Sequence, residues 1–140
     1  MTSILIVDDA QDAAETLAML FEACGHEAHV AFDGREGVAA ARHYAPHIIF
    51  LDLDMPVLDG LDAARAIRAA PEADDPFIVA LTAKSGGDVQ AITTAAGFDF
   101  YLRKPADSGV LLALVAELQG RRHGGGDGHP GRPNTRKLRP

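Results

Sequence analysis

Residues 47–60, with the sequence HIIFLDLDMPVLDG, limit most strongly what this chain can fold into. Positions 48–51 form a continuous apolar run, which is too short for a helix and is typical of a strand buried on both faces. The run ends at Asp52, and Pro56 prevents the strand from continuing. Because open sheets of parallel strands place ligand sites at the carboxyl ends of their strands, Asp52 is the first candidate for a reactive residue.

Similar apolar segments recur along the chain and alternate with helical patterns. Strands are predicted at residues 3–7, 27–32, 77–81 and 98–102, in addition to 48–51. Helices are predicted between Asp9 and Gly25, over 33–44 and 61–69, around 89–96, and from Asp107 or Ser108 to about 118. Short connections and strands without clean polar alternation indicate an α/β fold, a parallel sheet with helices on both faces.

Length and charge divide the chain into one domain and a tail. With 140 residues there is room for one domain, predicted at residues 1–119. This part carries 7 basic and 19 acidic residues, a balance of −12, which argues against a general nucleic-acid surface. Residues 120–140 carry 6 basic residues and 1 acid, a balance of +5, and are rich in Gly and Pro. A disordered basic tail is predicted there, because it has too little apolar surface to offset ordering.

The cellular compartment is predicted from cysteine usage and hydropathy. Cys24 is the only cysteine, which fits a reducing compartment. No apolar run approaches the length needed to span a membrane, and no signal peptide precedes Asp8 and Asp9. A cytoplasmic location without a membrane segment is therefore expected.

Polar residues at the ends of the predicted strands form the candidate site. Because the carboxyl ends of parallel strands meet at one edge, five side chains should converge there: Asp8, Asp9, Asp52, Thr82 and Lys104. Three neighbouring carboxylates repel one another, and a divalent ion with oxygen ligands relieves this repulsion. The expected ion is Mg²⁺. Lysine supplies a positive charge for a phosphoryl oxygen and threonine supplies a hydroxyl donor. The set predicts phosphoryl transfer onto the carboxylate of Asp52.

These residues, in this order, resemble the response-regulator receiver domain of two-component signalling, over residues 3–119. The resemblance rests on the following motifs: Ile6-Val7-Asp8-Asp9, Asp52 with Met55-Pro56 and Asp59-Gly60, Thr82-Ala83, and Tyr101 with Lys104-Pro105. It implies a flavodoxin-like, doubly wound sheet of five parallel strands in the order 2-1-3-4-5, with five helices. It also implies a signal-transduction or phosphorelay switch whose phosphodonor is a histidine kinase or a histidine phosphotransfer protein.

The resemblance also implies a role for each matching residue. Asp52 would be phosphorylated, and Mg²⁺ would be held by Asp9 and Asp52, by Asp8 through water, and by the backbone carbonyl of Asp54. Thr82 and Lys104 would hold the phosphoryl oxygens, and Thr82 would move toward the phosphate while Tyr101 turns inward. Lys104-Pro105 would be a cis peptide. The chain would help its own phosphorylation and dephosphorylation without being an enzyme that turns over a substrate.

Output is predicted from the length of the tail and from departures from the family pattern. A tail of 21 residues is too short for a DNA-binding domain, so a stand-alone regulator acting through an unidentified output protein is expected. Phe100 stands where small or acidic residues are common in the family, and is hypothesised to form an apolar docking patch instead of a salt-bridged dimer face.

Alternative interpretations remain open at this point. Each site residue has an ordinary role in isolation: Asp8 or Asp9 as a helix cap, Thr82 as another cap, Lys104 as a surface charge and Tyr101 as core. Asp52-Leu53-Asp54 also resembles the nucleophile motif of haloacid-dehalogenase-type Mg²⁺-dependent phosphatases. That family places its nucleophile on the first strand, and its Gly-Thr is replaced here by Met55-Pro56. A degenerate receiver that signals without phosphorylation is the third possibility.

Overall fold

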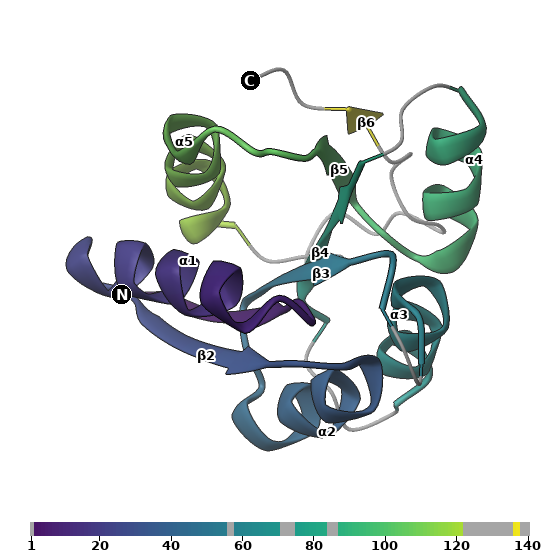
Figure 1. Cartoon of the computed structure of the whole chain (residues 1–140), viewed down its shortest axis with the longest axis horizontal. Coiled ribbons are helices and arrows are strands. Elements are labelled where there is room, and N and C mark those ends of the chain that lie inside the picture. The colour runs from purple at the N-terminus through teal and green to yellow at the C-terminus, as the bar shows by residue number, and fades with distance from the viewer. Residues whose placement is uncertain (1, 56–57, 71–74, 84–86, 122–135, 138–140) are drawn as a thin grey trace.

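The computed structural model describes residues 2–55, 58–70, 75–83, 87–121 and 136–137 (Figure 1). Strands and helices alternate along the chain, as the sequence patterns predict. Their bounds are β1 Ser3–Val7, α1 Gln11–Ala23, β2 Glu27–Ala31, α2 Gly34–Tyr44, β3 Ile48–Asp52, α3 Gly60–Ala69, β4 Phe77–Thr82, α4 Gly87–Ala96, β5 Phe100–Arg103, α5 Ser108–Gln119 and β6 Arg136–Lys137.

All strands pair in parallel in one sheet, in the order β2-β1-β3-β4-β5-β6. The predicted flavodoxin-like order 2-1-3-4-5 is therefore confirmed, and β6 is an additional strand beside β5. Register places Asp52 opposite Leu81 and Thr82 opposite Arg103. The functional strand ends of β3, β4 and β5 consequently lie next to one another.

Helices cover both faces of the sheet, α1 and α5 on one and α2, α3 and α4 on the other (Figure 1). The first face is filled by the ring stack of Phe21 and Phe50, with centroids 5.4 Å apart, and by leucines of α5. Every residue of β3 is buried, which confirms the strand expected from the apolar run that ends at Asp52. Burial of this strand on both faces fixes the carboxyl edge of the sheet, where Asp52 lies, against the core.

Aspartates begin three of the helices at the positions that the sequence indicated. The carboxylates of Asp33, Asp59 and Asp107 accept backbone N–H bonds from the first turns of α2, α3 and α5. These caps satisfy N–H groups that have no partner within the helix. The caps of α3 and α5 matter for the site because both helices come soon after strands that carry site residues.

The start of β5 differs from the prediction. The strand begins at Phe100 rather than at Phe98. Just before it, Asp99 donates its backbone N–H to the carbonyl of Ile78 at 2.8 Å and accepts the N–H of Ile78 with its carboxylate at 2.9 Å. Gly97, with a φ of +98°, closes α4 just before this segment, as its position in the sequence suggested. Phe100 is half-buried against the core beneath α1 and α5, and its predicted role as a docking patch stays a prediction.

The tail is only partly described. The predicted disorder of residues 120–140 falls mainly on 122–135 and 138–140, which lie outside the described residues. Gly120 caps α5, and Arg136–Lys137 form β6, a strand that the sequence did not predict. None of the helices in the described part is long and apolar enough to cross a membrane.

Candidate functional site

Charged side chains converge at the carboxyl edge of the sheet, as predicted. Lys104, which follows β5, places its Nζ 3.2 Å from Oδ2 of Asp8 and 3.2 Å from Oδ2 of Asp52. Carboxylate oxygens of Asp8, Asp9 and Asp52 lie within 4.8 Å of one another. Asp8 follows β1 and Asp52 ends β3, so three strands contribute to one polar cluster. The structure thus brings together four of the five side chains that were expected to converge; Thr82, the fifth, ends the neighbouring strand β4.

The loop after β3 is held close to the strand end by Gly60. A side chain at position 60 would collide with the backbone of Asp52 and Leu53. The N–H of Gly60 donates to the carbonyl of Leu53 at 3.1 Å, which brings the start of α3 against the end of β3. The motif Asp59-Gly60 thus supplies both the cap of α3 and the close approach that fixes the backbone of Asp52.

Asp52 is buried, with 4% of its surface exposed, yet it lies among polar groups rather than in the apolar core. Its Oδ1 accepts the backbone N–H of Asp54 at 3.1 Å, and its Oδ2 contacts Lys104. Burial raises the pKa of Asp52 to about 6, and the nearby Asp8 carboxylate adds to the rise, while the Asp54 N–H and Lys104 oppose it. The carboxylate is therefore anionic at neutral pH but held in an unfavourable environment.

Lys104 bridges the two buried carboxylates. Burial lowers its pKa, but attraction to Asp52 and Asp8 outweighs burial and leaves the pKa above its usual value. Its backbone N–H donates to the carbonyl of Thr82 at 2.7 Å, and the predicted cis peptide between Lys104 and Pro105 is present. The ammonium group is thus a fixed positive charge at the mouth of the cluster.

Asp8 and Asp9 differ in exposure. Asp8 is buried, and its Oδ1 accepts the N–H of Ala10 at 3.0 Å, while Asp9 is exposed. The N-cap residue of α1 is Ala10, which makes no side-chain cap bond. Helix capping therefore does not account for this pair of acids, because one carboxylate contacts Lys104 and the other faces solvent beside it.

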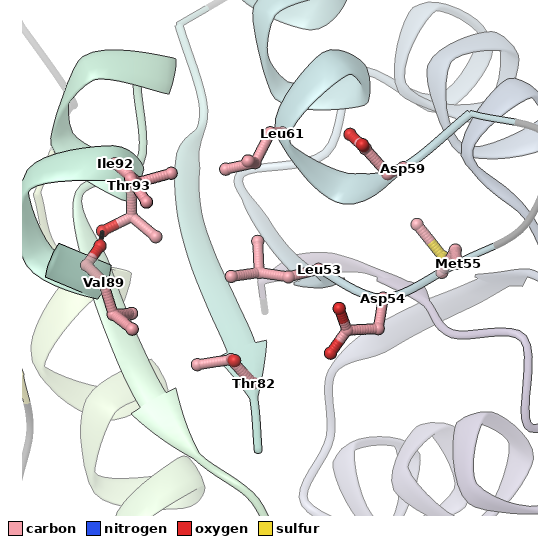
Figure 2. Close-up of a pocket in the computed structure, with 9 residues that line it drawn as sticks. All are labelled: Leu53, Asp54, Met55, Asp59, Leu61, Thr82, Val89, Ile92 and Thr93. Atoms are coloured by element: carbon pink, nitrogen blue, oxygen red, sulfur yellow. Dashed lines mark hydrogen bonds between the residues drawn. The ribbon is translucent and has the colours of Figure 1, made fainter. Parts of the chain in front are cut away.

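Thr82 ends β4 at the floor of a cavity of about 410 Å³ between α3 and α4 (Figure 2). Figure 2 shows apolar side chains pointing toward one another across this cavity, and Asp54 beside Thr82 at one end. Tyr101 is buried, with 3% of its surface exposed, in the core beneath these helices. The structure therefore places Thr82 and Tyr101 near the site, and their predicted movements stay predictions.

A second hollow, which the sequence analysis missed, adjoins the site between α1 and α5. It has a volume of about 850 Å³, and Asp8 and Lys104 lie at its rim. Leu17, Leu111 and the small Ala106 line its apolar part. The apolar stripes of α1 and α5 were visible in the sequence, but the gap between the two helices depends on how they pack and not on their patterns.

Comparison with known families supports one assignment. The profile of the response regulator receiver domain matches residues 4–116. The transcriptional regulatory protein PrrA of Mycobacterium bovis is 37% identical over 119 residues, which is 85% of this chain and 50% of PrrA. The protein PilH of Pseudomonas aeruginosa is 32% identical over 115 residues, covering 82% of this chain and 95% of PilH. The chain thus spans about half the length of the PrrA proteins it matches.

Solved structures share the fold. The chemotaxis protein CheY4 of Vibrio cholerae superposes with a TM-score of 0.79 and 27% identity, covering 84% of this chain and 98% of that one. A two-component response regulator from Clostridium difficile gives a TM-score of 0.79 with 26% identity, over 86% of this chain and 98% of that one. These two matches therefore include most of the residues that form the sheet and its helices.

Proposed function

The chain belongs to the response-regulator receiver domain family, and we propose that it accepts a phosphoryl group on Asp52 from a histidine kinase or a histidine phosphotransfer protein. The observation that carries this proposal is the position of Asp52 at the end of β3, within 3.2 Å of Lys104 and beside two further carboxylates. A nucleophilic carboxylate needs such a cationic environment to approach a phosphate.

The transfer step follows from the chemistry of the two groups. A carboxylate oxygen of Asp52 attacks the phosphorus of a phosphorylated imidazole, the new O–P bond forms and the P–N bond breaks. The bonding electrons stay on the imidazole nitrogen. Because the other ring nitrogen carries a proton before transfer, the ring leaves as neutral imidazole. The product is an acyl phosphate on Asp52, a covalent intermediate of a known type. Because Asp52 is anionic above a pKa of about 6, it is ready for attack at neutral pH.

Lys104 is the residue that stabilises the transferred group. Its Nζ contacts Oδ2 of both Asp8 and Asp52 before transfer. After transfer the negative charge of Asp52 moves outward onto the phosphoryl oxygens, which are better acceptors for an ammonium group. The raised pKa of Lys104 keeps this group cationic throughout. The hydroxyl of Thr82, at the end of the adjacent strand, is proposed to donate to another phosphoryl oxygen.

The acidic cluster fits a magnesium ion. Oxygens of Asp8, Asp9 and Asp52 lie within 4.8 Å of one another, and hard oxygen donors are the ligands that Mg²⁺ prefers. We propose that Asp9 and Asp52 bind the ion directly, Asp8 through water, and Asp54 through its backbone carbonyl. When bound, the ion supplies positive charge that offsets the carboxylates and the incoming phosphate. The raised pKa of Asp52 reflects the repulsion and burial that such an ion would relieve.

Signal output is proposed to follow from a change around Thr82. A shift of Thr82 toward the phosphoryl group would change the cavity between α3 and α4 that it borders, and Tyr101 packs in the same core. The domain is proposed to act as a switch or relay and not as an enzyme that turns over a small substrate. Its output partner is proposed to be a protein. A reducing, cytoplasmic setting agrees with Cys24, a free and exposed thiol.

Intact-mass measurement tests the proposal. The chain is incubated with acetyl phosphate and Mg²⁺, and one added phosphoryl group is expected, which disappears in Asp52→Asn. Asp62→Asn is the matched control, because Asp62 is an exposed acid on α3 outside the cluster. Retention of the added group in Asp52→Asn would contradict the assignment of the acceptor.

The same assay separates the alternatives. Continuous release of phosphate from many phosphomonoesters would favour a phosphatase of the haloacid-dehalogenase type. Binding of Mg²⁺ without any phosphorylation, with acetyl phosphate and with a panel of histidine kinases, would favour a degenerate receiver.

A further inference from the structure

The two outer edges of the predicted five-stranded sheet differ in how they are protected. At the β2 edge, Nε2 of His29 lies 2.8 Å from Oε2 of Glu27. The ring of Tyr44 stacks on that of His29, with centroids 3.6 Å apart. Charged and bulky groups on an edge strand hinder pairing with another chain. The β2 edge therefore carries its own protection.

The β5 edge has no comparable protection in its own sequence. Phe100, Tyr101 and Leu102 precede Arg103, so three apolar residues come before the first charge. An apolar edge strand offers unpaired backbone N–H and C=O groups to any other extended segment. High β-propensity combined with low charge makes such an edge a site for association between chains.

In the structure the first half of this edge is paired with β6 (Figure 1). Arg136 pairs with Phe100 and Lys137 pairs with Tyr101, in parallel. The outermost described strand is thereby β6, which is two residues long and has a basic sequence. Short strands and lysine-type charges are the devices by which native sheets discourage edge-to-edge pairing.

Charge favours this placement of the segment. Residues 1–119 carry a balance of −12, whereas residues 120–140 carry +5, so the tail is attracted to its own domain. Two copies of this dibasic sequence carry like charge, which disfavours their association. Only 14 residues separate Arg121 from Arg136, so a segment tethered to its own β5 reaches an effective concentration in roughly the millimolar range. A second copy of the chain would have to be present at a comparable concentration to supply this strand instead.

We propose that Arg136–Lys137 guards the β5 edge: this dibasic segment occupies the edge in its own chain and prevents a second copy of the domain from pairing there. The guard is independent of phosphorylation at Asp52. It assigns a role to a part of the tail that the proposed function leaves unexplained.

Three variants of the full chain test the guard. Arg136→Pro combined with Lys137→Pro removes both backbone donors and both charges of β6. Arg136→Ser with Lys137→Ser removes the charges but keeps the backbone donors. Arg121→Ser with Arg122→Ser is the matched control, because it removes two tail charges outside β6. Thermal melting checks that each variant folds.

Two measurements are made on each variant. Amide hydrogen exchange is followed at residues 100–103, and sedimentation velocity is recorded over a range of protein concentrations. In the proline pair we expect exchange at β5 to accelerate at least about threefold and a concentration-dependent dimer to appear. The serine pair should keep more of the protection than the proline pair but dimerise more than wild type. The control should match wild type in both measurements.

Each contrary result overturns the proposal in a distinct way. Unchanged exchange at residues 100–103 in the proline pair would show that β6 does not cover the edge. Faster exchange without any dimer would show that β6 covers the edge but does not guard it. A wild-type dimer that is lost in the proline pair would show that a second copy supplies the strand.

Discussion

Among the described residues, buried charged groups lie at both ends of the sheet, but those at the amino end are fully paired and those at the carboxyl end are not. At the amino end, Arg68 of α3 lies with its side chain 9% exposed and contacts Asp99, whose side chain is 1% exposed, at 2.8 Å. Arg68 also donates to the carbonyls of Gly97 at 3.0 Å and Pro76 at 2.6 Å, and pairs with Asp75 at 2.8 Å. This arginine joins the end of α3 to the segments before β4 and β5.

At the carboxyl end the buried charges are not balanced in the same way. Asp8 and Asp52 share the ammonium group of Lys104, a third carboxylate, that of Asp9, lies beside them, and Asp52 has a raised pKa. A buried pair whose hydrogen bonds are complete holds elements together, whereas unbalanced charge costs stability and is kept where chemistry needs it. We therefore interpret the buried pair at the amino end as structural, and the cluster at the carboxyl end as the proposed functional site.

The largest effect is expected at the structural end. Arg68→Ala should lower the free energy of unfolding by about 3–5 kcal/mol, because it leaves the buried carboxylate of Asp99 without its cation. Arg68→Lys should recover only part of the loss, since an ammonium group cannot reproduce the forked contacts. Urea unfolding monitored by circular dichroism measures both.

Arg65→Ala is the matched control for this prediction, because Arg65 lies on the same helix in an exposed pair with Asp62. Its loss should change the free energy of unfolding by less than about 1 kcal/mol. Equal losses at the two arginines would mean that the buried network does not carry the difference between the two ends.

The next effect has the opposite sign and lies at the functional end. Asp52→Asn should raise the free energy of unfolding at pH 7, without divalent ions, by up to roughly 3 kcal/mol. Because the folded pKa of about 6 exceeds the reference value of 3.8, the folded state binds more protons in this window and stability falls as pH rises through it. The advantage of Asp52→Asn should therefore vanish near pH 4.

Urea titrations at several pH values measure this difference, with Asp62→Asn as the control in which no such trend is expected. A destabilised Asp52→Asn at pH 7 would show that the carboxylate is stabilised by its neighbours and not strained by them.

The third effect comes from metal binding. Mg²⁺ at about 100 times its dissociation constant should stabilise the wild-type chain by about 2.7 kcal/mol, through preferential binding to the folded state. Asp9→Asn should reduce this gain, because it removes an exposed member of the acidic cluster while leaving the buried pair of Asp8 and Lys104 in place. Thermal melting with Mg²⁺ and with EDTA provides the comparison. An undiminished gain in Asp9→Asn would place the ion elsewhere.

The functional end was predictable from the sequence because its residues are tied to strand ends. An apolar run that stops at Asp52, and similar runs before Asp8, Thr82 and Lys104, fix both the parallel sheet and the edge where the side chains meet. In a parallel sheet, the order of these strands along the sequence is then enough to predict that the four side chains lie close together. The site therefore required only element types and topology, which are the most reliable features of a periodic pattern.

The structural end was not predictable by the same argument. Asp99 lies in a segment typical of a strand, and Arg68 is an ordinary basic residue in the last turn of a predicted helix. Their contact joins α3 to the segment before β5, and it depends on how deeply α3 and α4 pack against the sheet. The strand β6 was missed for a similar reason, since a two-residue basic segment has no apolar period to signal it.

The smallest effect tests whether the burial of an aspartate that contacts Arg68 decides how much it contributes to stability. Asp75 contacts the same arginine as Asp99 and at the same distance of 2.8 Å, but its side chain is 42% exposed. Asp75→Ala should cost only about 0.5 kcal/mol in urea unfolding, because water replaces an exposed carboxylate at little cost. Asp99→Ala should cost several times more, since it leaves both Arg68 and the N–H of Ile78 without that acceptor inside the protein. Comparable losses for the two aspartates would mean that both contribute equally to the stability that Arg68 provides, and that burial does not set the contribution of each pair.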